Sequence, residues 1–221
     1  CMHKTVQNLI SIQSSIKSKL INLDKINKIP TIIAVSKTFS LQHIMPLIEN
    51  GHIHYGENKV QEAIEKWTEI KKENDKIKLH LIGKLQTNKV KFAVKIFEYI
   101  HSLDSEKLAK KIADEQNKVN VKPKIFIQIN LADESQKSGI MKKNLLDFYN
   151  FSKNLGLNII GIMCIPPYDE DSSKYFSQMS SLNSSINLNE LSMGMSSDYL
   201  KALEYNSTFL RIGSNIFGKR D

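Results

Sequence analysis

Strand-like and helix-like segments alternate along almost the whole chain. The strand-like segments are short, and most are apolar runs, whereas the segments between them repeat apolar residues every three to four positions. Eight strands that are each followed by a helix indicate an α/β protein with the (β/α)8 architecture of a TIM barrel. A doubly wound open sheet is the alternative, because a count of strands does not establish closure. The expected strands lie at residues 31–36, 52–55, 78–82, 99–103, 124–131, 158–165, 190–193 and 209–212.

The chain is long enough for one large barrel domain, and no linker or change of composition divides it. We therefore expect a single domain over residues 1–221, with Cys1 as a processing remnant ahead of Met2. Apolar residues at helical spacing also predict an extra amphipathic helix over residues 6–23, before the first strand.

The charge of the chain is strongly positive but is not arranged as in a nucleic-acid-binding protein. The formal net charge is +8, yet the basic residues are mixed with Asp and Glu along helical faces, without a basic tail. No apolar run approaches the roughly 18 residues of a membrane span, and no apolar leader segment begins the chain. Cys164 is the only cysteine besides Cys1, which fits a reducing compartment. We expect a cytoplasmic protein that binds neither nucleic acid nor membrane.

A lysine follows the first expected strand. The run Ile32–Val35 is apolar without alternation, so it predicts a short strand that is buried on both faces. Lys37 comes directly after it, at the carboxyl end, where barrels and open α/β sheets place their chemistry. Taken alone, the position is also explained by a side chain that reaches solvent as the strand leaves the core.

Two later strand ends carry residues suited to binding an anion. The segment from Gly194 to Asp198 joins the seventh strand to a helix and offers free backbone N–H groups and hydroxyls. Gly213 and Ser214 follow the eighth strand in the same manner. Phosphate commonly binds at these two loops in TIM barrels. Helix capping by Ser196 and Asp198 is the alternative explanation for the first loop.

A phosphate site and a strand-end lysine on one barrel face suggest pyridoxal 5′-phosphate (PLP). Its aldehyde forms a Schiff base with a lysine, and its phosphate anchors the other end of the molecule. Burial at the barrel mouth should lower the pKa of Lys37 and so favour the free amine. Arg211, one of two arginines among 31 basic residues, could lie against the ring nitrogen. Because a guanidinium does not give up its proton, that nitrogen would stay unprotonated.

Six motifs give the chain a specific resemblance to a known family. They are AVSKT at 34–38, YGENKVQE at 55–62, HLIGKLQTNK at 80–89, HSLD at 101–104, LSMGMSSD at 191–198 and RIGSNIFGKR at 211–220. Together they span nearly the whole chain, which resembles the YggS/PROSC family of PLP homeostasis proteins. The resemblance implies a TIM barrel similar to the N-terminal domain of alanine racemases.

The resemblance also implies which residues contact PLP. Lys37 would carry the cofactor as a Schiff base, and Arg211 would face the pyridine nitrogen. The other contacts would come from Asn58 on the side of the ring hydroxyl, Met195 beside the phosphate, and Ser196, Gly213 and Ser214 around the phosphate.

The family resemblance implies a protein that binds PLP, supplies it and buffers its free level, without strong catalysis of its own. The alternative is an amino-acid racemase of the alanine-racemase type, which needs an acid/base group on each face of the cofactor. In such racemases a partner's second domain provides one of these groups, and the chain has no room for that domain after its last strand. His54, Tyr55 and His80 are nearby titratable candidates, although packing or strand capping is the better explanation for them. We expect a monomer that passes PLP to apo-enzymes.

Overall fold

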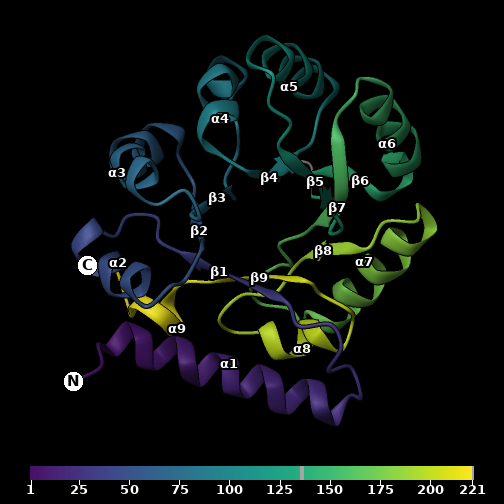
Figure 1. Ribbon diagram of the computed structural model, residues 1–221. Helices are drawn as coiled ribbons and strands as arrows, with labels where there is room; N and C mark the ends of the chain where they lie inside the picture. The colour runs from purple at the N-terminus through teal and green to yellow at the C-terminus, as the bar shows by residue number, and fades with distance from the viewer. Residues whose placement is uncertain (135–136, 221) are drawn as a thin grey trace.

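A closed barrel of parallel strands forms the centre of the computed structural model, which describes residues 1–134 and 137–220 (Figure 1). The strand order is β4-β3-β2-β1-β9-β8-β7-β5, and β4 also pairs with β5, so the sheet closes on itself. Closure excludes the open-sheet alternative and confirms the predicted barrel. Within the described residues, the eight barrel strands are β1 (Thr31–Val35), β2 (His54–Glu57), β3 (Lys78–Leu81), β4 (Tyr99–Leu103), β5 (Lys124–Asn130), β7 (Asn158–Met163), β8 (Glu190–Ser192) and β9 (Phe209–Ile212).

Helices surround the barrel and bury their apolar faces against it (Figure 1). In α3, for example, Ala63 and Trp67 lie one turn apart and are both fully buried, as expected for the inner stripe of an amphipathic helix. The surrounding helices are α2 (Leu41–Glu49), α3 (Val60–Glu73), α4 (Val90–Ile96), α5 (Glu106–Val119), α6 (Leu145–Asn154), α7 (Ser173–Ser185), α8 (Tyr199–Leu203) and α9 (Ser214–Phe217), with 3-10 turns at Thr87–Lys89 and Lys142–Asn144.

The extra N-terminal helix, α1 (Lys4–Asn22), packs beside α2, α8 and α9 on the outside of the barrel (Figure 1). Leu9, Ile12 and Ile16 recur every three to four residues and are all buried, so one apolar stripe faces the barrel. Ile10 lies on the opposite side and is exposed. The helix predicted ahead of the first strand is confirmed.

The barrel interior combines an aromatic cluster with buried polar groups. Ile33, Phe126 and Phe209 belong to the cluster. Side chains of a strand alternate between its two faces, so Arg211, two residues after Phe209, also points inward and is only 4% exposed. Buried polar groups are costly unless they are hydrogen-bonded. The partners of Arg211 therefore bear directly on what the barrel mouth can bind.

The structure differs from the sequence-based prediction at two strands. β2 begins two residues later than expected and continues through Gly56, which pairs with Val35 of β1 and with His80 of β3. A Cβ at Gly56 would lie 2.9 Å from Ile33 Cγ2, so the close packing inside the barrel requires glycine there. A two-residue strand that was not predicted, β6 (Ile140–Met141), pairs with the end of β5 outside the barrel.

The packing of α1 predicts unequal effects for two neighbouring isoleucines. Ile12 is 4% exposed and Ile10 is 44% exposed. Ile12→Ala should lower the free energy of unfolding by about 2–4 kcal/mol, because it removes buried methyl groups and leaves a cavity. Ile10→Ala, the matched control, should change it by less than about 0.5 kcal/mol. Urea unfolding followed by circular dichroism measures both, and equal effects would contradict this packing.

Candidate functional site

The carboxyl ends of four neighbouring barrel strands gather the site residues predicted from the sequence. β2, β1, β9 and β8 are consecutive around the barrel, and because the strands are parallel their carboxyl ends open on one face. Arg211 lies within β9, one residue before the carboxyl end of that strand. The loops of this face carry Asn58 after β2, Lys37 after β1, Gly213 and Ser214 after β9, and Met195 and Ser196 after β8.

Lys37 is half-buried, and positive charges lie near its amine. Burial is the main reason that its pKa is lowered, and Arg220 and Arg211 lower it further, while the Glu62 carboxylate acts in the opposite direction. A lower pKa leaves more of the amine unprotonated and therefore nucleophilic at neutral pH. The expectation that burial at the barrel mouth depresses this pKa is confirmed in its direction.

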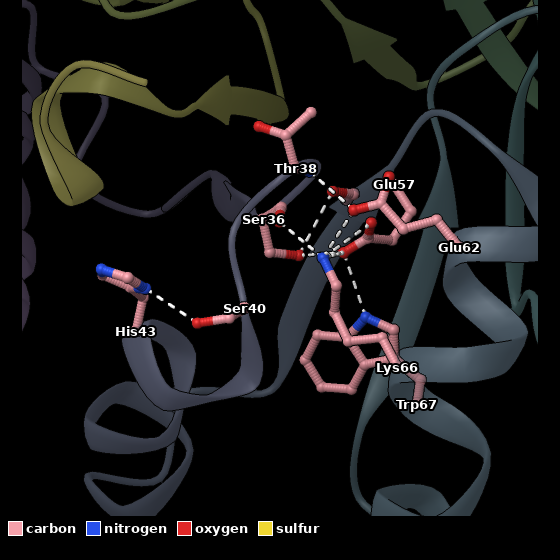
Figure 2. Close-up of polar contacts among 9 residues, drawn as sticks. Ser36, Thr38, Ser40, His43, Glu57, Glu62, Lys66 and Trp67 are labelled. Atoms are coloured by element: carbon pink, nitrogen blue, oxygen red, sulfur yellow. Dashed lines mark hydrogen bonds and ion pairs between the residues drawn. The ribbon is translucent and has the colours of Figure 1, made fainter. Parts of the chain in front are cut away.

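An ion cluster lies beside Ser36 and Thr38, the two residues that flank Lys37 in the sequence (Figure 2). Lys66 of α3 donates to the carboxylates of Glu57, at 3.1 and 3.2 Å, and Glu62, at 2.9 Å. It also donates to the main-chain carbonyl oxygen of Ser36, at 2.8 Å. Glu57 is fully buried and accepts further hydrogen bonds from the Ser36 hydroxyl and the Trp67 indole. The cluster connects the ends of β1 and β2 to α3.

Arg211 is fixed inside the barrel by hydrogen bonds to two other strand ends. Its Nη1 donates to the carbonyl oxygen of Ser192, at 3.0 Å, and to the Ser192 hydroxyl. Its Nη2 donates to the carbonyl oxygen of Cys164, at 2.8 Å. Burial lowers the pKa of Arg211, yet a guanidinium keeps its charge in proteins. Among the described residues its Nε–H and one Nη2–H have no acceptor, so they are available to a ligand.

Three histidines continue this hydrogen-bonded chain through the barrel interior. The Ser192 hydroxyl lies 2.8 Å from Nδ1 of His101. Nε2 of His101 lies 2.9 Å from Nδ1 of His80, and Nε2 of His80 lies 2.8 Å from Nδ1 of His54. The chain thus runs from Arg211 on β9 to His54 at the start of β2.

Arg211 can only donate, and an arrangement in which each following group donates to the next satisfies the whole chain. The Ser192 hydroxyl accepts from Arg211 and has its own hydrogen for Nδ1 of His101. His101 then donates from Nε2 to His80, and His80 donates from Nε2 to His54. Burial lowers the pKa of all three histidines, to about 4 for His54. Each ring is therefore neutral at neutral pH, with its hydrogen on Nε2.

The two predicted anion-binding loops are joined to each other and keep backbone donors free. Asn215 donates its N–H to Oγ of Ser196, at 3.2 Å, and its side-chain amide to the Ser196 carbonyl oxygen, at 3.1 Å. No acceptor among the described residues takes the N–H groups of Ser196, Ser197 or Gly213. Ser214 is the first residue of α9, so its N–H also has no partner within the helix. The loops therefore present a row of donors from two adjacent strand ends.

Helix capping does not explain the first of these loops. Asp198 precedes α8 but makes no side-chain capping bond to the helix. Its carboxylate instead accepts the N–H of Met195, at 2.8 Å, and the Ser196 hydroxyl is occupied by Asn215. The side chain of Met195 is 44% exposed beside these donors. Neither side chain therefore caps α8, whereas the Ser196 hydroxyl accepts the N–H of Asn215, the second residue of α9.

Asn58 lies partly buried where β2 opens onto the same face. Gly83, which follows β3, packs against it so closely that a Cβ at Gly83 would lie 2.6 Å from the Asn58 carbonyl oxygen. Glycine at position 83 therefore allows the two loops to meet and fixes the main chain that carries Asn58.

Sequence reasoning did not single out the ion cluster or the Ser192–His101 link. Glu57 and Glu62 belong to the motif YGENKVQE, and His101 begins the motif HSLD, so a signal was present. These motif residues had no physical interpretation from the sequence, because charged residues on helices and at strand ends are usually solvated.

Comparison with known proteins identifies relatives of the whole chain. The family model described as alanine racemase, N-terminal domain, matches residues 14–221. The pyridoxal phosphate homeostasis protein of Pasteurella multocida is 34% identical and that of Vibrio cholerae 33% identical; the alignments cover 97% and 100% of this chain and 97% and 98% of theirs. The solved structure of PipY from Synechococcus elongatus with PLP bound is 31% identical, with a TM-score of 0.85 over 97% of this chain and 100% of that one.

The closed barrel and its strand-end lysine thus define a member of the class built on the alanine racemase N-terminal domain. Within that class, the chain belongs to the family of pyridoxal phosphate homeostasis proteins, as the six sequence motifs indicate.

The described residues contain neither a membrane-spanning helix nor a metal-binding cluster. None of their helices combines the length and the hydrophobicity needed to cross a membrane. No group of three or more His, Cys, Asp or Glu side chains among them is arranged to hold a metal ion.

The neutral histidine chain predicts how stability depends on pH. A histidine whose pKa is lower in the folded state stabilises the fold fully above the unfolded value of about 6.5, and this stability is lost as the pH falls from there to the folded pKa. The free energy of unfolding should therefore rise steeply between pH 4 and pH 6.5. His54, with a folded pKa of about 4, contributes up to about 1.4 kcal/mol per pH unit in that range.

Urea unfolding at a series of pH values measures this slope. His54→Gln keeps an acceptor for His80 but cannot titrate, so its slope should be smaller by the contribution of one proton. An identical slope in the variant would show that His54 is not held neutral by the fold.

Proposed function

We propose that this protein binds PLP at the barrel face formed by β2, β1, β9 and β8, with the cofactor attached to Lys37. One observation carries the proposal. A half-buried amine of lowered pKa and two loops with free N–H donors lie at neighbouring strand ends. The family also supports it, because PipY has been solved with PLP bound.

The residues present fit both ends of the cofactor. When PLP is bound, its aldehyde carbon forms a double bond to a primary amine, and the aldehyde oxygen leaves as water. Lys37 supplies this amine. The N–H groups of Ser196, Gly213 and Ser214 suit the phosphate, which backbone donors at a helix start bind well. Met195 would flank the phosphate, and Asn58 would lie on the side of the ring hydroxyl.

Arg211 would limit how strongly bound PLP withdraws electrons. Its free N–H groups can donate to the pyridine nitrogen, but a guanidinium cannot protonate it. An unprotonated ring withdraws electrons more weakly than a protonated one, so it stabilises less negative charge on a bound amino acid. The bonds to Ser192 and Cys164 hold Arg211 in this orientation.

The residues that the sequence offered as a second acid/base group are engaged elsewhere. Tyr55 donates its hydroxyl to the His52 carbonyl oxygen, and burial raises its pKa. His54 and His80 are neutral members of the chain inside the barrel. Racemisation needs proton transfer on both faces of the cofactor. We therefore infer that the protein holds and supplies PLP and has no strong catalytic activity.

We further propose that the protein acts as a single-domain monomer in the cytoplasm and passes PLP to apo-enzymes. The buried free thiol of Cys164 supports a reducing compartment. Covalent attachment through Lys37 is reversible, because water regenerates the aldehyde and the amine, and this suits a donor of the cofactor.

Replacing the lysine tests the attachment. After addition of PLP and borohydride, the native protein should carry one PLP mass on the peptide that contains Lys37. Lys37→Ala should lose this adduct completely, because the other amine near the end of β1, that of Lys66, is engaged by Glu57, Glu62 and the Ser36 carbonyl oxygen. Lys59→Ala, at an exposed neighbour, should keep the adduct. Peptide mass spectrometry gives the answer. An adduct on a different lysine in the native protein would refute the assignment, and α-deuterium exchange of amino acids at enzyme-like rates would favour the racemase.

The phosphate assignment predicts a difference between PLP and pyridoxal, which lacks the phosphate. Ser214→Asp places a negative charge at the start of α9 and should weaken PLP binding by about tenfold or more, because like charges repel. Binding of pyridoxal should change little, and Ser214→Ala serves as the uncharged control. Absorbance titrations measure both ligands. Equal losses for PLP and pyridoxal would place the phosphate elsewhere.

A further inference from the structure

The two peptide groups on either side of Lys37 are both hydrogen-bonded to the same ion cluster. The Ser36 carbonyl oxygen belongs to the peptide before Lys37 and accepts from Nζ of Lys66, at 2.8 Å. The Thr38 N–H belongs to the peptide after Lys37 and donates to the Glu62 carboxylate, at 2.6 Å. Glu62 and Lys66 are one helical turn apart on α3 and bond each other, at 2.9 Å. The cluster therefore holds the main chain of Lys37 from both directions (Figure 2).

The turn held by this cluster is strained. Thr38 has a φ of 68°, in the left-handed region that β-branched residues avoid. Such a conformation is unfavourable and persists only where its surroundings enforce it. Here the Thr38 N–H donates to the Glu62 carboxylate, at 2.6 Å. Strain of this kind concentrates at functional sites, where it directs a particular side chain.

The burial of the cluster is not explained by stability alone. The side chain of Lys66 is 8% exposed and that of Glu57 is fully buried. The desolvation cost of a buried ion pair offsets most of its attraction, and apolar residues of similar size often serve stability equally well. The ammonium of Lys66 donates to Glu57, Glu62 and Ser36, so its three N–H groups are all used. This arrangement fixes the position of the Ser36 carbonyl in a way that apolar packing would not.

We propose that Glu62 and Lys66, anchored by Glu57, are positioning residues that direct the Lys37 amine across the strand ends toward a carbonyl ligand. The proposal rests on the proposed function for the identity of that ligand, PLP, but concerns the orientation and reactivity of the amine itself. Glu62 has a second effect through its charge, which opposes the influence of Arg211 and Arg220 on Lys37.

Two kinds of variant separate the contact from the charge. Glu62→Gln keeps an acceptor for Thr38 but removes the charge, whereas Glu62→Ala removes both. The double variant Lys66→Met with Glu57→Gln removes the bond to Ser36 without leaving a buried charge unpaired, so it should fold. Glu65→Gln and Lys72→Met, on the exposed side of α3, are the matched controls.

The first measurement uses the apo-protein, so it does not depend on PLP. Limiting acetic anhydride labels lysines in proportion to their free amine, and peptide mass spectrometry follows Lys37 against pH with Lys59 as the internal reference. We expect the Lys37 midpoint to move to lower pH in Glu62→Gln and to stay in place in Glu65→Gln. An unchanged midpoint in Glu62→Gln would overturn the electrostatic role of Glu62.

The second measurement is the rate at which PLP becomes fixed to Lys37, followed by absorbance and borohydride trapping. Glu62→Ala and the double variant should react about tenfold or more slowly, because a misplaced amine approaches the aldehyde poorly. Glu62→Gln and both controls should react within about threefold of the native rate. Native rates in Glu62→Ala and in the double variant would overturn the positioning role. Failure of the native protein itself to fix PLP would instead refute the proposed function and leave the labelling result valid.

Discussion

The pairing of the first barrel strand with the last is the interaction on which the site depends. β1 and β9 are in register from Thr31 with Phe209 to Ala34 with Ile212. This pairing sets the end of β1, with Lys37, beside the loop that begins at Gly213. In an open sheet these strands would be free to lie apart, and one ligand could not reach both the amine and the anion loops. Closure of the barrel is therefore a condition for the site as well as for the fold.

A network of buried polar groups in the barrel interior begins at Arg211 of β9. Arg211 is charged and buried, and leaving such a charge without partners would cost several kcal/mol. Ser192 and Cys164 supply acceptors, and the chain of neutral histidines from His101 onward satisfies Ser192 in turn. The ion cluster beneath Lys37 follows the same principle at the neighbouring strand. In both places buried hydrogen bonds fix the position of a basic side chain, Arg211 in one and Lys66 in the other.

Much of this arrangement could be predicted from local patterns. The apolar run before Lys37, the segment 194–198 after β8 and the Gly213–Ser214 pair after β9 are each interpretable from a few neighbouring residues, so the strand ends and these loops could be predicted. The contacts of His101 were not, since its partner Ser192 is 91 positions away and meets it only after the barrel closes. The extension of β2 through Gly56 likewise depends on pairing with both neighbours. Glu57 is charged, and only the closed barrel shows that it is buried.

The proposed site would hold PLP through the Lys37 amine, the backbone donors of two loops and a guanidinium that cannot protonate the ring nitrogen. A crystal structure of the protein grown with PLP tests this most directly. We expect continuous density from Nζ of Lys37 to the cofactor, its phosphate on the N–H groups of Ser196, Gly213 and Ser214, and its ring nitrogen facing Arg211. Density for PLP at another lysine, or a phosphate away from these two loops, would contradict the proposed site.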